Sequence, residues 1–206
     1  MIDLLPAVIY GFAGAVTPGP LLMFLFSQSL ASGWKRTLPA TFSPLITDGP
    51  VALLVLTVLS HVSTGLLYGL RLIGGAFILY LALEAAKAWR DFDQKNPASR
   101  HSFSNNLLKA MIINWLNPNV YLGWSLILGP MVLTAWKQAP DRGLALILAF
   151  YASLILTMII LVRIFGAARL LGIKTQRTLI ACSSVALAVL AFYQIWIGAS
   201  ALLFKS

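Results

Sequence analysis

Apolar residues run along the chain in six long segments separated by short polar connections. Within each segment they are nearly continuous and do not alternate with polar residues, which is typical of membrane-crossing helices and not of barrel strands. Lipid offers no hydrogen-bond partner to an open backbone, so each segment is expected to be helical. The segments span approximately residues 4–31, 38–60, 66–88, 105–135, 143–167 and 178–203. The pattern predicts an all-α, polytopic membrane protein of six transmembrane helices.

The longest polar connection, residues 89–104, divides these segments into two halves of three. We therefore expect one transmembrane domain over residues 1–206, with a first repeat at about 1–90 and a second at about 105–206. No Lys or Arg precedes the small residues Ala13-Gly14-Ala15, so a cleavable signal is not expected. The first segment is predicted to be a retained span.

Composition agrees with this assignment. Hydrophobic residues make up 59% of the chain and charged residues only 10%, whereas soluble domains carry about 25% charged residues. The net charge of +9 would suggest nucleic acid in a soluble protein. In a membrane protein, basic residues hold the cytoplasmic face, so no nucleic-acid partner is expected. Cys182 is the single cysteine, which excludes an intrachain disulfide, and no Cys/His cluster predicts a metal site.

The basic residues also predict the orientation. The connections after the first, third and fifth segments share one side of the membrane, which carries Lys35, Arg36, Lys87, Arg90, Lys95, Arg100, Lys109, Arg163, Arg169, Lys174 and Arg177. The other side carries only Arg71, Lys137, Arg142 and Lys205. The positive-inside rule places the first set in the cytoplasm. Both termini of this multi-pass protein are then expected outside the cytoplasmic (inner) membrane.

Three of the six helices are predicted to be broken near mid-span. A proline inside a helix removes a backbone donor, and Thr, Ser or Asn before it resembles the start of a new helix. The breaks are Thr17-Pro18-Gly19-Pro20 in the first helix, Ser43-Pro44 with Thr47-Asp48-Gly49-Pro50 in the second, and Asn114-Trp115-Leu116-Asn117-Pro118-Asn119 in the fourth.

Two of these breaks occupy corresponding positions. Pro18 and Pro118 stand 100 residues apart, each in the first helix of its half. The halves begin on opposite sides of the membrane, so the pattern predicts an inverted 3+3 repeat. Paired interruptions of this kind are the best sequence indication of a transporter binding site.

The broken ends suggest the chemistry of that site. The half-helices that begin after Pro20 and Asn119 would point free N–H groups at the midplane from opposite directions, which suits a carboxylate. The preceding half-helices end at Val16 and Leu116. Their carbonyls carry the opposite partial charge and could receive an ammonium group or a coupling cation.

Asp48 is the one acidic residue at a predicted mid-span. An intramembrane carboxylate is costly and is a functional candidate by default. It could bind a substrate ammonium, carry a proton, or only cap a helix that restarts at Gly49-Pro50.

Weaker candidates surround these positions. The amides of Asn114, Asn117 and Asn119 could bind polar groups of a substrate or cap helices, and Trp115 could wall a pocket or pack against lipid. The spans also contain Tyr151, Ser153 and Gln194, which are predicted to link helices. Arg71 is predicted to lie near a helix end and to extend to the interface. The pairs Gly11/Ala15 and Gly65/Gly69 predict close packing within the bundle, with a homodimer contact as the alternative.

At these residues the sequence resembles the lysine-exporter (LysE/RhtB) superfamily, which includes homoserine and threonine exporters. The family pattern is a G-x-x-x-P-G-P break in helix 1, an aspartate in helix 2 and an N-P-K-type break in helix 4. Gly14 through Pro20, Asp48 and Asn117-Pro118 match these elements in order, and the resemblance covers nearly the whole chain. Asn119 replaces the usual basic residue, which indicates a divergent branch and does not favour lysine as the solute.

The resemblance implies a secondary transporter that exports an amino acid or related small metabolite by alternating access, coupled to a proton or another cation. The alternative is a metal-cation efflux carrier of the same superfamily, which would favour several carboxylates, thiols or imidazoles in the spans. The sequence has no phosphate-binding glycine loop and no acid–base constellation, so neither intrinsic ATP hydrolysis, an enzyme nor a cofactor is predicted. A purely structural scaffold would leave three broken helices and Asp48 unexplained.

Overall fold

The computed structural model describes residues 4–57, 64–90, 103–168 and 172–203, and the regular structure in these ranges is helical throughout. In chain order the elements are α1 (Leu5–Val16), α2 (Pro20–Ser32), α3 (Trp34–Thr37), the 3-10 turn η1 (Leu38–Phe42), α4 (Ser43–Thr57), α5 (Thr64–Arg90), α6 (Phe103–Trp115), α7 (Pro118–Gly123), the π-helical turn η2 (Trp124–Leu128), α8 (Gly129–Gln138), α9 (Pro140–Ala167) and α10 (Ile173–Leu203).

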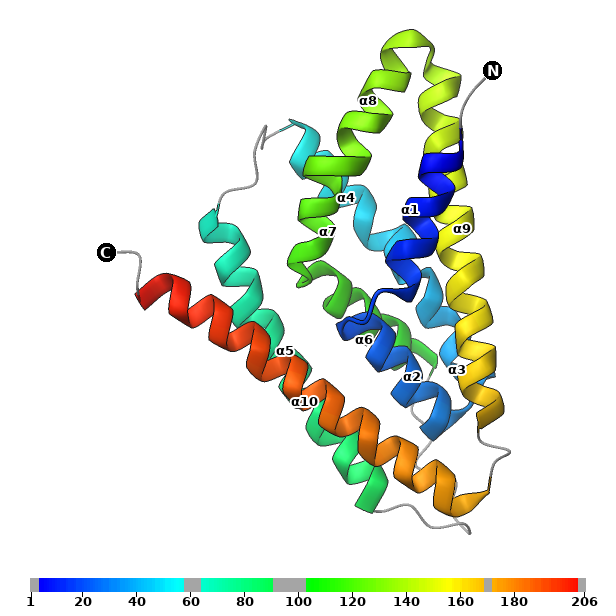
Figure 1. Ribbon diagram of the computed structural model, residues 1–206, viewed down its shortest axis with the longest axis vertical. Helices are drawn as coiled ribbons and strands as arrows, with labels where there is room; N and C mark the ends of the chain where they lie inside the picture. Colours follow the sequence, from blue (N-terminus) through cyan, green and yellow to red (C-terminus); the bar gives the residue numbers. More distant parts are fainter. Residues whose placement is uncertain (1–3, 58–63, 91–102, 169–171, 204–206) are drawn as a thin grey trace.

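These elements follow the predicted apolar segments. The chain descends through α1 and α2, returns through α4, descends through α5, returns through α6 to α8, descends through α9 and returns through α10 (Figure 1). Among the described helices, α5, α9 and α10 are each long and apolar enough to cross a membrane, and the bent pair α1–α2 qualifies as a fourth, broken span. The remaining two predicted spans consist of shorter helices. The all-α, polytopic prediction is thus confirmed.

Of the two predicted interruptions in the second helix, the one at Thr47-Asp48-Gly49-Pro50 is wrong, because α4 continues from Ser43 to Thr57 and contains Pro50 in its interior. Ser43-Pro44 coincides with the change from the 3-10 turn η1 to α4, which begins at Ser43. Pro44 stands in the first turn, where an N–H group needs no intrahelical partner. Pro50 therefore removes only one intrahelical hydrogen bond, and the helix tolerates that loss.

The main core lies between α1, α2, α6 and α9. Helix α1 packs along α9, and Gly11 permits the closest approach: a Cβ placed there would lie 2.5 Å from the carbonyl oxygen of Phe150. This confirms close packing for the Gly11/Ala15 pair. Gly65 and Gly69 have nothing within 4 Å of the corresponding position, so their predicted packing within the bundle is not observed.

Helices α5 and α10 form a second layer, which is inclined to α9 in Figure 1. Two adjacent glycines of α5 face different neighbours. A Cβ at Gly74 would meet the carbonyl oxygen of Leu116 at 2.8 Å, and one at Gly75 would meet Ile195 of α10. Helix α5 is therefore held closely against α10 and against Leu116, the residue that follows α6.

The basic helix ends gather at one end of the molecule. The end of α2, the last turn of α5, the end of α9 and the start of α10 lie at the bottom of Figure 1, opposite the α8–α9 connection. Arg163 stacks over the Trp34 ring at 5.2 Å, and Arg177 stacks over Trp89 at 5.5 Å. Such cation–π pairs place indoles and cations together, as the boundary of a membrane requires.

Candidate functional site

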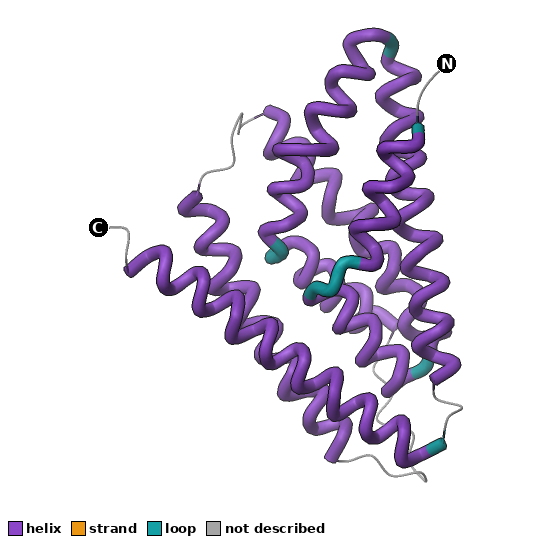
Figure 2. Tube along the Cα trace, in the orientation of Figure 1, coloured by secondary structure: helices purple, strands orange, loops and turns teal. Residues whose placement is uncertain are grey.

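The two remaining helix breaks lie close together near the middle of the molecule, where Figure 2 draws them as loop. Both line one cavity of about 330 Å³. Of the predicted site residues, the cavity is lined by Thr17, Gly19, Pro20, Asp48, Asn114, Asn117 and Asn119. Pro18 and Pro118 shape the two breaks but do not line this cavity.

The first break arises from local chemistry. Thr17 takes an extended conformation, as residues before proline do, while its hydroxyl donates to the Ala13 carbonyl at 2.6 Å. Helix α2 then restarts with Pro20 in its first position and Gly19 as a cap without a side chain. The first N–H groups of α2 consequently have no intrahelical partner and lie beside the cavity.

The second break differs in this respect. Asn117 caps α7 through its side-chain oxygen, which accepts a hydrogen bond from the Asn119 N–H at 3.1 Å. The Val120 N–H is bonded to the Asn117 carbonyl. The start of α7 is therefore largely satisfied within the chain, so two equivalent open helix ends, as the sequence suggested, are not observed.

Asp48 is the centre of a buried polar cluster. The Asn114 amide donates to Asp48 Oδ1 at 2.7 Å and also to the Thr47 hydroxyl at 2.7 Å. The Tyr151 hydroxyl donates to Asp48 Oδ2 at 3.2 Å. Asp48 and Asn114 are each only 4% exposed. Three helices from both halves, α4, α6 and α9, thus converge on one carboxylate.

This placement removes one of the roles considered for Asp48. Asp48 lies inside α4, well after its start at Ser43, so it does not cap a restarting helix. Besides Asn114 and Tyr151, the side chains of Trp124 and Thr47 are also hydrogen-bond partners of the Asp48 carboxyl group. Asp48 lines the cavity and is thus the carboxylate at which a proton or an ammonium group could bind.

Aromatic residues that the sequence did not single out form part of the cavity wall. These are Tyr10, Trp124 and Phe150. A weak signal existed for two of them: Tyr10 precedes Thr17 by seven positions and Trp124 follows Asn117 by seven, a spacing that returns to the same helix face. Phe150 lies on a uniformly apolar helix and gave no such signal. Trp115 is half exposed and does not line the cavity.

Trp124 owes its position to an irregular turn. The stretch Trp124–Leu128 is π-helical and is followed directly by Gly129-Pro130. Proline cannot donate a backbone hydrogen bond, and single π-helical turns are frequent at functional sites. Both Trp124 and Leu128 face the cavity.

Arg71 lies deeper in its helix than predicted. It stands a full two turns inside α5, and its guanidinium donates to the Gln194 side chain of α10 at 2.9 Å. Together with Pro20 and Asn117, both residues line a small pocket of about 10 Å³ behind the breaks. Gln194 therefore links helices as expected, and so does Ser153, which donates to the Val8 carbonyl.

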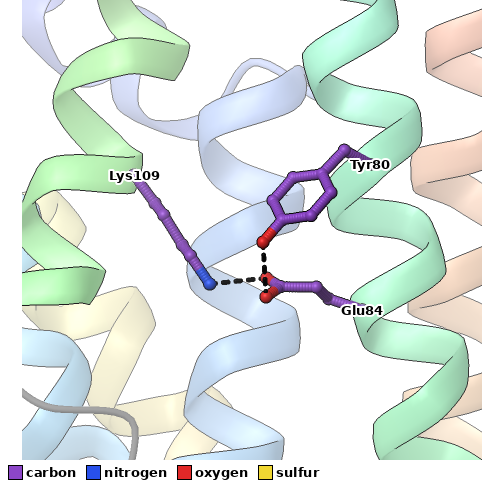
Figure 3. A network of polar contacts seen from close by, with 3 residues as sticks. All are labelled: Tyr80, Glu84 and Lys109. Carbon is purple, nitrogen blue, oxygen red and sulfur yellow. Dashed lines mark hydrogen bonds and ion pairs between the residues drawn. The ribbon is translucent and has the colours of Figure 1, made fainter.

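A second polar network joins the two layers nearer the basic end. Lys109 of α6 forms an ion pair with Glu84 of α5 at 2.5 Å, and Tyr80 donates to the same carboxylate at 2.9 Å (Figure 3). The two charged side chains are 14% and 23% exposed. Since α5 and α6 contact each other little elsewhere, this pair is a main link between them.

We expect the single variants Lys109→Glu and Glu84→Lys to be destabilised, and the double exchange to recover most of the loss. A hydrogen bond to a charged group contributes about 1.5–3 kcal/mol, and each single change also opposes like charges. Thermal unfolding of the purified protein in detergent, read as a double-mutant cycle, measures the coupling. Additive losses in the double variant would show that the pair contributes nothing.

The arrangement is suited to holding a small cationic group beside a buried carboxylate. Among the described residues, no three His, Cys, Asp or Glu side chains come together as a metal site would require. A comparison with protein families finds a match to the model of LysE type translocators over residues 12–198. No curated protein and no solved structure is matched by the chain.

Proposed function

Because the chain belongs to the LysE type translocator family and is thus a membrane transporter that exports small molecules, we propose that its solute is an amino acid or a related small metabolite. Members of this family are transporters and not enzymes. The observation that carries the proposal is the position of Asp48, a buried carboxylate in a cavity lined by both helix breaks.

The two ends of an amino acid find complementary groups in this cavity. The ammonium group pairs with the negative charge of Asp48, which lines the cavity together with Asn114. The carboxylate lies at the start of α2, where the N–H groups after Pro20 carry a partial positive charge. A solute held in this way is bound through backbone and side chain together, as in other carriers with broken helices.

Export by alternating access fits the same geometry. Helices α1 and α6 each end at a break, so the segments on either side can tilt relative to each other about the cavity. We propose a proton or another cation as the coupling ion, with Asp48 as its site or as the substrate ligand. The corresponding breaks support an inverted repeat of about 1–90 and 105–206 around the 89–104 connection.

Transport by the purified protein in liposomes tests the proposal. A panel of labelled amino acids and divalent metal ions is offered with and without a pH gradient. Counterflow of an amino acid, accelerated by the gradient, is the expected result. Counterflow of a metal ion alone would instead support the alternative of a metal-cation efflux carrier.

We propose the cytoplasmic membrane as the location, with both termini outside. In a Cys182→Ser background, a cysteine at Ala98 is expected to resist a membrane-impermeant thiol reagent in intact cells, because the basic connections face the cytoplasm. A cysteine at Gln138, which is exposed at the opposite end of the molecule, serves as the matched control and should be labelled. The reverse labelling pattern would show that the protein has the opposite orientation in the membrane.

A further inference from the structure

We propose that the cavity selects an α-amino acid with an uncharged, apolar side chain. The inference rests on the proposed function, since it names the class of solute that the same cavity would carry. The first observation is the number of charged side chains in the cavity wall. Among the described residues that line the cavity, Asp48 is the only one with a full charge.

One carboxylate balances one ammonium group. The α-ammonium of an amino acid satisfies Asp48, so a second cation on the side chain would find no acidic partner in the wall. A side-chain carboxylate would add a like charge near Asp48. Enclosing an unpaired charge is costly, so both basic and acidic amino acids are disfavoured.

The wall next to Asp48 is aromatic. Trp124, Phe150 and Tyr10 line the cavity. Tyr151 lies behind this wall, donates to Asp48 and packs edge-on against Phe150 with ring centres 4.9 Å apart. Phe150 in turn stacks on Tyr10 at 5.6 Å. The stacked rings of Phe150 and Tyr10 therefore give the cavity wall an apolar, aromatic part, against which an apolar side chain would be buried.

The wall is also fixed in shape. The Tyr10 hydroxyl lies directly over Gly123, in the space that a Cβ at this position would occupy. Tyr10 can reach this position only because residue 123 is a glycine. The cavity of about 330 Å³ equals roughly eleven water volumes of ~30 Å³ each, which accommodates an amino acid of medium size.

Norleucine and lysine form the decisive pair of solutes, because they share a four-carbon side chain and differ in the terminal ammonium group. In counterflow with the purified protein in liposomes, norleucine is expected to exchange at least tenfold faster than lysine at equal concentration. Equal or faster exchange of lysine would overturn the inference and leave the proposed function standing. Failure of every amino acid to exchange would overturn both.

A matched pair of variants tests the cause. Met158 is 4% exposed and lines the cavity on the α9 face that also carries Phe150. Met158→Glu supplies the second carboxylate and is expected to shift the ratio of lysine to norleucine exchange upward at least tenfold. Met158→Gln has the same shape without the charge and should not shift it. An equal shift in both variants would contradict selection by charge. If neither variant folds, the wild-type comparison alone decides.

Discussion

Asp48→Asn is expected to abolish uphill export of the solute. Asparagine keeps the shape and an acceptor oxygen for Asn114 or Tyr151, so the fold should persist while the negative charge is lost. A hydrogen bond to a charged group is worth about 1.5–3 kcal/mol. At about 1.4 kcal/mol for each factor of ten, the loss of solute affinity would be about ten- to a hundredfold.

Two assays separate the two possible roles of Asp48. If Asp48 carries the coupled proton, gradient-driven export disappears while solute exchange in liposomes continues. If it binds the ammonium group, both activities fall together. Asp141→Asn makes the same chemical change at an exposed position in the first turn of α9 and should transport normally. Wild-type uphill export by Asp48→Asn would exclude both roles.

Gly11→Ala is expected to lower the stability of the bundle more than its small size suggests. The added methyl group would lie 2.5 Å from the Phe150 carbonyl oxygen and 3.1 Å from the Leu154 nitrogen, so backbone and not a flexible side chain must move. Overpacking of this kind costs about 1–3 kcal/mol. Because Phe150 also lines the cavity, transport is expected to fall with stability.

Gly65→Ala supplies the control for this prediction. Nothing lies within 4 Å of the position that its methyl group would occupy, and alanine favours a helix over glycine by about 1 kcal/mol. Thermal unfolding in detergent should therefore show an unchanged or raised midpoint for Gly65→Ala and a lowered one for Gly11→Ala. Equal midpoints for the two variants would contradict the packing argument.

The prolines illustrate how far sequence reasoning reaches. Thr17-Pro18-Gly19-Pro20 and Asn117-Pro118 were predicted to interrupt helices and do so, because each combines a residue suited to cap or end a helix with a proline suited to begin one. Helix α4 likewise contains two prolines, Pro44 and Pro50, but it is continuous. Whether a proline breaks a helix depends on its place in the turn and on packing, and neither is visible before the helix start is known.

The candidate site was predictable only in part. Asp48 stands out in sequence because a carboxylate in an apolar segment needs a reason. Asn114 and Tyr151 were also named from the sequence, but their pairing with Asp48 was not, since they are 66 and 103 positions away and the contacts depend on how α6 and α9 pack. The aromatic wall was missed for a related reason: in a membrane helix, residues facing lipid and residues facing a cavity are equally apolar.

The link between Glu84 and Lys109 bears on how the protein is assembled in the membrane. Ribosomes deliver α5 to the bilayer before α6, so Glu84 enters the membrane before Lys109, with which it pairs in the folded protein. Tyr80, one turn away on the same helix, supplies a hydrogen bond from the outset. The third helix of the first half therefore reaches its final electrostatic environment only when the second half docks. Through this ion pair, the final placement of α5 depends on the later arrival of α6.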